Sequence, residues 1–140
     1  MSVPEPTLEI VRSARIIAIV GLSPDAARPS HGVGTYLQAQ GYRILPVTPR
    51  GGPILGQPAF PDLPTAAAAV APERIDIVDV FRRPEHVAAL LPDILAVHPK
   101  LVWLQLGIRD DATAAKLEAA GISVVQDHCL GVEHSLRIRR

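Results

Sequence analysis

Residues 16–50, IIAIVGLSPDAARPSHGVGTYLQAQGYRILPVTPR, contain the pattern that decides the fold. The apolar run 16–20 (IIAIV) is typical of a strand that is covered on both faces. A loop follows, and residues 31–42 (HGVGTYLQAQGY) predict a helix that is closed by Gly41. The run 43–48 (RILPVT) predicts a second strand. A strand, a helix and a strand in this order are typical of a βαβ unit with parallel strands.

The same alternation continues toward the end of the chain. Further strands are predicted at 75–81 (IDIVDVF), 101–106 (LVWLQL) and 122–126 (ISVVQ). Helices are predicted at 6–14, 83–97, 109–121 and 131–138. We therefore expect one α/β domain over residues 1–140, a Rossmann-like, doubly wound, mainly parallel sheet of five or six strands with helices on both faces.

Two stretches fit this pattern less well. Residues 48–64 (TPRGGPILGQPAFPDLP) are rich in Pro and Gly. At most a short strand around Ala59 and Phe60 is expected there, with a brief alanine-rich helix after it. Pro46 lies inside the predicted second strand, although proline cannot donate a hydrogen bond to a neighbouring strand. The strand is kept because the residues that flank Pro46 fit it.

Composition excludes several classes of protein. The chain is 48% hydrophobic and has a formal net charge of zero, which favours neither a disordered chain nor a basic nucleic-acid platform. Its single cysteine, Cys129, cannot form an internal disulfide, and no leader-like segment precedes the first strand. The apolar runs are far shorter than the roughly 20 residues that span a bilayer. We expect a cytoplasmic protein that contacts neither nucleic acid nor membrane.

The loop after the first strand is the first candidate site. A nicotinamide or flavin site has G-x-G-x-x-G directly after the strand, whereas here the next glycines after Gly21 come ten or more residues later, at positions 32 and 34. The longer loop offers groups that suit a diphosphate, namely Ser23, Arg28, Ser30 and the free amides at the helix start near His31 and Gly32. The alternative is a solvated loop with a surface arginine.

The end of the second strand favours a phosphorylated ribose. An NAD site places Asp or Glu here, but this chain has Thr48, Pro49 and Arg50, followed by Gly51 and Gly52. A cation at this position suits the 2′-phosphate of NADP or the 3′-phosphate of coenzyme A. The missing glycine pattern weighs against NADP. Alternatively, Arg50 merely caps a flexible turn.

Several blocks together resemble a known family, the small CoA-binding proteins. These blocks are VGLSPDAARPSHGV, ILPVTPRGGPILGQPAFPDL, DIVDVFRRPEHV, VWLQLGI and DHCLGVEH, which lie in family order between about residues 15 and 134. The single domain of this family is similar to the N-terminal domain of the succinyl-CoA synthetase alpha subunit and of ADP-forming acyl-CoA synthetases. The family's usual Asn-Pro is Thr-Pro here, and the Thr48 hydroxyl can still form hydrogen bonds.

The resemblance implies a coenzyme A site made of four groups of residues. The diphosphate of the 3′-phospho-ADP group would lie among Gly21, Leu22, Ser23, Arg28, Pro29, Ser30 and His31. The phosphorylated ribose would lie at Thr48, Pro49 and Arg50. Adenine and ribose would border Phe81, Arg82 and Arg83, and the pantetheine path would pass Gln105, Leu106 and Gly107. Alternatively, Phe81 packs under the loop and the arginines lie in solvent.

Other functions remain possible at this point. Cys129 lies near His128, Glu133 and His134, but a lone Cys beside a His in sequence is not a catalytic pair. The spacing of these residues also does not match a zinc site, so neither catalytic residues nor metal ligands are predicted. The synthetases relay phosphate through a histidine on a further domain and use a nucleotide-grasping domain, and this sequence contains neither.

We expect a non-catalytic module that binds coenzyme A or an acyl-CoA, with protein partners undetermined. The alternatives are an NADP-binding or oxidoreductase-type Rossmann protein, or a partner-binding protein whose nucleotide pocket has decayed. A mixed disulfide between Cys129 and the CoA thiol is a further hypothesis.

Overall fold

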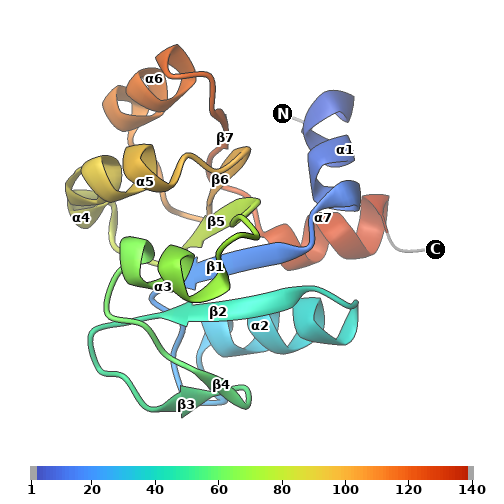
Figure 1. Cartoon of the computed structure of the whole chain (residues 1–140). Coiled ribbons are helices and arrows are strands. Elements are labelled where there is room, and N and C mark those ends of the chain that lie inside the picture. The colour runs from blue at the N-terminus through green and yellow to red at the C-terminus, as the bar shows by residue number, and fades with distance from the viewer. Residues whose placement is uncertain (1–2, 139–140) are drawn as a thin grey trace.

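The fold is a five-stranded parallel sheet, seen in a computed structural model that describes residues 3–138 (Figure 1). Along the chain the strands are β1 (Ile16–Val20), β2 (Arg43–Val47), β5 (Ile77–Val80), β6 (Leu101–Leu104) and β7 (Ser123–Val125). Their order in the sheet is β2-β1-β5-β6-β7, and all neighbours are parallel. The chain adds β2 on one side of β1 and the later strands on the other, so the order reverses between β1 and β5. The predicted doubly wound fold is confirmed.

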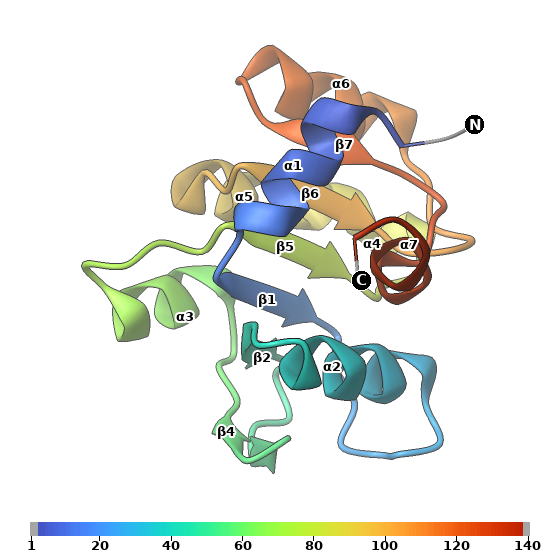
Figure 2. The same ribbon diagram turned by 90° about the vertical axis from the view of Figure 1, so that its right-hand side faces the viewer.

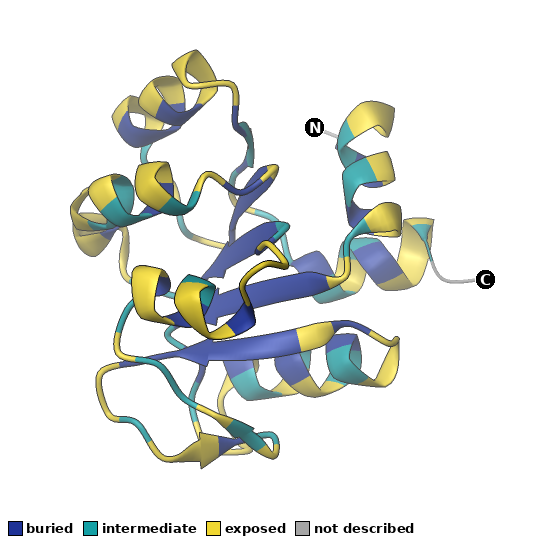
Figure 3. Ribbon diagram, in the orientation of Figure 1, coloured by how far each residue is buried: buried dark blue, intermediate teal, exposed yellow. Residues whose placement is uncertain are grey.

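Helices cover both faces of this sheet (Figures 1 and 2). One face packs against α1 (Glu5–Ser13), α2 (Pro29–Ala39) and α7 (Leu130–Arg137). The other face packs against α3 (Leu63–Val70), α4 (Pro84–Val87), α5 (Leu91–Val97) and α6 (Asp111–Ala119). Successive strand residues point to opposite faces, so Ile17 and Ile19 join the first layer while Ala18 and Val20 join the second. Figure 3 shows the strands as the buried centre between helices whose outer sides are exposed. No helix in residues 3–138 combines the length and apolar character needed to span a membrane.

The predicted helix 83–97 is wrong as a single element. It consists of α4, a 3₁₀ turn at Ala88–Leu90 and then α5, which begins one residue before Pro92. Proline has no amide hydrogen, and its ring clashes with the carbonyl four residues earlier in a continuous helix. The chain therefore starts a new helix at Leu91, where proline is tolerated in the first turn.

The irregular segment also differs from the prediction. It contains an antiparallel hairpin, β3 (Pro53–Ile54) with β4 (Gln57–Pro58), and Phe60 forms only a single parallel bridge with Val47. The Phe60 amide donates to the Pro46 carbonyl at 2.9 Å, and the Phe60 carbonyl accepts from the Thr48 amide at 2.8 Å. The alanine-rich helix is confirmed as α3, which is capped by the Asp62 side chain.

These bonds also explain why strand β2 tolerates a proline at position 46. The strand β2 lies at the edge of the sheet, where its inner side pairs with β1. In a parallel strand the amide and the carbonyl of one residue point to the same side. Because the Pro46 carbonyl points outward to Phe60, the missing amide hydrogen also lies on the outer edge. No hydrogen bond between β1 and β2 is lost.

Gly21 joins the ends of three strands. Its amide donates to the Val47 carbonyl of β2 at 2.8 Å, and the Phe81 amide after β5 donates to the Val20 carbonyl at 2.8 Å. Gly21 has a φ of +87°, and a Cβ atom there would lie 2.3 Å from the Phe81 carbonyl oxygen. No side chain fits at that distance, so glycine is required both by the backbone angle and by the close approach of β5.

Asp79 places a carboxyl group in the buried centre of the sheet. It pairs in register with Ile19 of β1 and Trp103 of β6. Its side chain is fully buried, and neither carboxylate oxygen has a partner within residues 3–138. Burial raises the pKa of this carboxyl well above its ordinary value because the charged form loses its hydration.

We predict that Asp79 makes the protein less stable as the pH rises. A carboxyl whose pKa is raised by folding contributes its full stability below its unfolded pKa of about 4. That contribution is lost as the pH rises toward the folded pKa, with a slope of up to about 1.4 kcal/mol per pH unit. Urea unfolding of the wild type should show this slope, and Asp79→Asn should remove it. Glu118→Gln, at an exposed position on α6, is the control and should keep the slope. Equal slopes in the wild type and Asp79→Asn would contradict the prediction.

We predict that Gly21→Ala destabilises the fold by more than about 3 kcal/mol, because it adds a steric clash to an unfavourable backbone angle. Gly121 is the matched control, since its φ is +85° but a Cβ there meets nothing within 4 Å. Gly121→Ala should cost only about 1 kcal/mol in urea unfolding. Similar losses in both variants would show that the approach of Phe81 is unimportant.

Candidate functional site

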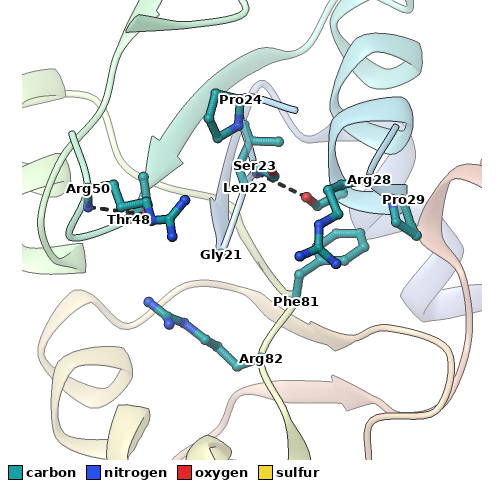
Figure 4. Close-up of a pocket in the computed structure, with 11 residues that line it drawn as sticks. Gly21, Leu22, Ser23, Pro24, Arg28, Pro29, Thr48, Arg50, Phe81 and Arg82 are labelled. Carbon is teal, nitrogen blue, oxygen red and sulfur yellow. Dashed lines mark hydrogen bonds between the residues drawn. The ribbon is translucent and has the colours of Figure 1, made fainter. Parts of the chain in front are cut away.

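A cavity of about 420 Å³ opens at the carboxyl ends of the strands, where the order reverses between β1 and β5. Ligands of doubly wound sheets bind at this position. The cavity is lined by Gly21, Leu22, Ser23, Pro24, Arg28, Pro29, Ser30, Thr48, Arg50, Phe81 and Arg82 (Figure 4). Its walls therefore come from the β1–α2 loop, the start of α2 and the ends of β2 and β5.

Hydrogen bonds within the β1–α2 loop hold one wall of the cavity. The Ser30 hydroxyl is buried and accepts from the Ser23 amide at 3.0 Å. The Ser23 hydroxyl accepts from the Asp25 amide at 3.0 Å, and the Asp25 carbonyl accepts from the Arg28 amide at 3.0 Å. A hydroxyl that accepts a hydrogen bond can still donate its own proton. Ser23 and Ser30 thus shape the loop and keep donors for an anion.

The N-terminus of α2 borders the same cavity. Arg28 is the residue before the helix, and no side chain caps this end within the described residues. Pro29 occupies the first helical position, which suits its fixed φ and its missing amide hydrogen. The helix dipole gives this end a partial positive charge. Together these features favour an anion beside Ser30.

Three arginines concentrate positive charge in the cavity. Figure 4 shows the side chains of Arg28, Arg50 and Arg82 reaching toward the space between the strand ends. Within residues 3–138 none of the three forms an ion pair, and the cavity lining contains no Asp or Glu. The whole chain has no net charge, so this excess of cations is local.

The turn after β2 presents Arg50. Thr48 is buried, and its side-chain oxygen accepts from the Arg50 amide at 3.4 Å. Its carbonyl accepts from the Gly51 amide at 3.4 Å, which closes a tight turn. These contacts turn the chain at the rim of the cavity, where the exposed Arg50 side chain meets the space above the strands.

The structure brings most of the predicted site residues together. Those that line the cavity are Gly21, Leu22, Ser23, Arg28, Pro29, Ser30, Thr48, Arg50, Phe81 and Arg82. Those outside its lining are His31, Pro49, Arg83, Gln105 and Gly107. Pro24 lines the cavity and was not predicted, although its place inside the first loop was a usable signal.

Gln105 and Gly107 have structural contacts instead. The Gln105 side chain is buried, and its Oε1 accepts from the Leu130 amide at 3.1 Å, at the start of α7. The Gly107 amide donates to the Asp127 carboxylate at 2.6 Å. Both residues therefore tie the end of β6 to the chain that leads into α7. Their role along a pantetheine path stays a prediction.

His128 and Cys129 precede α7, and His134 lies within it. The Trp103 indole donates to the His128 carbonyl at 2.8 Å, and Cys129 is the residue before the helix. The His134 Nδ1 lies 2.9 Å from the Tyr36 hydroxyl. Within residues 3–138, no three His, Cys, Asp or Glu side chains gather as a metal site.

Comparison with known proteins identifies the family. A family model described as CoA binding domain matches residues 15–135. The uncharacterized protein YneT of Bacillus subtilis strain 168 is 34% identical over 128 residues, which is 91% of each chain. The solved structure of cell-free ID.343 from Thermus thermophilus is 42% identical with a TM-score of 0.86. That match covers 94% of this chain and 96% of the other.

A likeness also extends to a larger protein. The apo form of the dinucleotide forming acetyl-coenzyme A synthetase 1 from Ca. Korarchaeum cryptofilum matches with a TM-score of 0.69 and 16% identity. The match covers 84% of this chain but 27% of the synthetase, and at this identity it shows a shared fold alone. The family assignment rests instead on the model match, which spans both the first loop and the start of α7. This chain belongs to the CoA-binding domain family.

Proposed function

We propose that this protein binds coenzyme A or an acyl-CoA through its 3′-phospho-ADP part and catalyses no reaction of its own. The observation that carries this proposal is the cavity at the switch point, which holds three arginines that have no acidic partner among residues 3–138. Its volume of about 420 Å³ lies within the range of small-molecule sites, about 300–1,000 Å³.

The diphosphate is assigned to the first loop and the start of α2. Arg28, the Ser23 and Ser30 hydroxyls and the positive end of the helix dipole all meet there. Each of these groups stabilises negative charge, and the loop is already held in place by its own hydrogen bonds. Little ordering of the loop is then needed when the ligand binds.

The 3′-phosphate is assigned to Arg50, and adenine with its ribose to the space beside Phe81 and Arg82. A guanidinium can form two parallel hydrogen bonds with a phosphate, and it can also stack on a planar ring. Phe81 and Arg82 follow β5, while Arg50 follows β2, so the two groups of residues border β1 from opposite sides. An adenosine between them would span the top of β1.

We predict that Arg50→Ala weakens CoA binding by roughly 10- to 100-fold, since a hydrogen bond to a charged group contributes about 1.5–3 kcal/mol. Isothermal titration should give micromolar binding of CoA to the wild type and weaker binding of dephospho-CoA. If Arg50 contacts the 3′-phosphate, Arg50→Ala should leave the affinity for dephospho-CoA nearly unchanged.

Arg43→Ala is the matched control for this titration. Arg43 is also an exposed arginine, but it begins β2, whereas Arg50 follows the end of that strand, so the two lie at opposite edges of the sheet. An equal loss of affinity for CoA and dephospho-CoA in Arg50→Ala would remove the phosphate role. Tighter binding of NADPH than of CoA would overturn the proposed ligand.

We predict that the protein does not turn over a CoA thioester. Acetyl-CoA incubated with the protein should release free thiol at the rate seen in buffer alone, measured with a thiol-reactive dye. Release that depends on the protein and is lost in Cys129→Ser would show a catalytic role for the thiol. A mixed disulfide of Cys129 with CoA and a cytoplasmic location both stay predictions.

A further inference from the structure

A second hollow, which we call the α2–α7 groove, lies between helices α2 and α7. Its volume is about 320 Å³, and it is lined by Gly32, Val33, Tyr36, Cys129, Gly131, Val132, Ser135 and Leu136. None of these side chains is charged. Val132 is 54% exposed and Leu136 is 73% exposed, so both leave apolar surface in contact with water. The groove is therefore an apolar surface that is open to solvent.

Two glycines create the hollow. The helices α2 and α7 pack against each other, as Figure 2 also shows. A Cβ atom at Gly131 would lie 3.6 Å from the Val33 side chain, while a Cβ at Gly32 would meet nothing within 4 Å. Side chains at these two positions would occupy the groove. The hydroxyl of Tyr36 is already bonded to His134, so the groove keeps few free polar groups, mainly Ser135 and Cys129.

The groove lies next to the nucleotide cavity along α2. Pro29 lines the cavity, and Gly32 and Val33 line the groove three and four residues later. Residues at this spacing lie on the same face of a helix, and one turn advances only about 5.4 Å. Both α2 and α7 follow strands of a parallel sheet, so both begin at the edge where the cavity opens. The two hollows are therefore about one helical turn apart, and the pantetheine arm, which is longer than one turn, would have to curve over the start of α2 before the acyl group enters the groove.

We propose that the α2–α7 groove binds the acyl chain of an acyl-CoA whose nucleotide occupies the cavity. This inference rests on the proposed function and names the class of ligand, an acyl-CoA with an apolar chain rather than free CoA. In such a ligand the acyl group lies at the opposite end from the phosphates. The uncharged lining suits a hydrocarbon chain, because each methylene removed from water adds favourable free energy.

The experiment compares a series of ligands by isothermal titration, using CoA, acetyl-CoA, butyryl-CoA, hexanoyl-CoA and octanoyl-CoA. A fully buried methylene raises affinity roughly fourfold, and an open groove buries each methylene in part. The wild type should therefore bind octanoyl-CoA at least about tenfold more tightly than acetyl-CoA. The double variant Val132→Gln, Leu136→Gln should bind CoA like the wild type but lose the dependence on chain length. Both positions are exposed, so the fold tolerates the change.

Leu95→Gln is the matched control, since Leu95 is 38% exposed on α5, on the other face of the sheet. It should keep the dependence on chain length. If CoA binds and affinity does not rise with chain length, the groove proposal is wrong while the proposed function stands. If CoA itself does not bind, both are wrong. If chain-length dependence persists in the double variant, the chain lies elsewhere and the proposal is overturned.

Light scattering of the same proteins tests whether a second copy of this chain, and not an acyl chain, covers the α2–α7 groove. A wild-type dimer that the double variant converts to a monomer, together with unchanged dependence on chain length, would show that a second copy covers the groove. That result would also overturn the proposal. A monomer in both proteins, with chain-length dependence lost in the variant, is the result we expect.

Discussion

The close approach of Gly21 to the Phe81 carbonyl is the constraint on which the site depends. It brings the end of β5 against the end of β1, while the Gly21 amide holds the end of β2. Beyond this point the segments that follow β1, β2 and β5 separate, because α2, the turn at Thr48 and the segment after Phe81 leave in different directions (Figures 1 and 4). The cavity is the space between them. A larger residue at position 21 would push β5 away and change the place of every side chain that lines the cavity.

Charge in the cavity is arranged differently from charge on the rest of the surface. The ion pairs within residues 3–138, such as Arg12 with Glu5 and Arg43 with Glu73, involve no residue that lines the cavity. The arginines of the cavity have no such partners there, so their charges are not neutralised by the protein itself. An anionic ligand would supply the missing negative charge. This arrangement favours binding of phosphates without requiring a basic protein overall.

The two faces of the sheet pack different kinds of side chain. The layer with α3, α4, α5 and α6 packs a large cluster of apolar side chains, with Thr113 as a buried polar residue. The layer with α1, α2 and α7 holds polar groups within the apolar packing, among them the buried carboxyl of Asp79 and the contact of Tyr36 with His134. The same layer carries the α2–α7 groove on its outer side.

The sequence by itself determined the five strands of the main sheet, most of the helices and which strand ends carry the arginines of the cavity. Apolar runs such as 16–20 and 101–104 are continuous because both faces of a parallel sheet are covered, and this pattern is local. Arg28, Arg50 and Arg82 could be selected because each follows a predicted strand, and the carboxyl ends of parallel strands meet at one edge. Pro92 was also a local sign that the predicted helix is broken, but the apolar residues around it favoured a single helix in the prediction.

Only the tertiary structure decided the contacts between residues far apart in the chain. Gln105 was predicted on the ligand path, yet its side chain bonds the start of α7, 25 residues later. In the described part of the chain, Phe60 pairs with the edge strand at one position and the Asp79 carboxyl has no hydrogen-bond partner, because the packing of neighbouring elements fixes what each side chain meets. The α2–α7 groove joins residues of two helices that lie about a hundred positions apart. Such contacts depend on how the helices pack on the sheet, which no local pattern of residues contains.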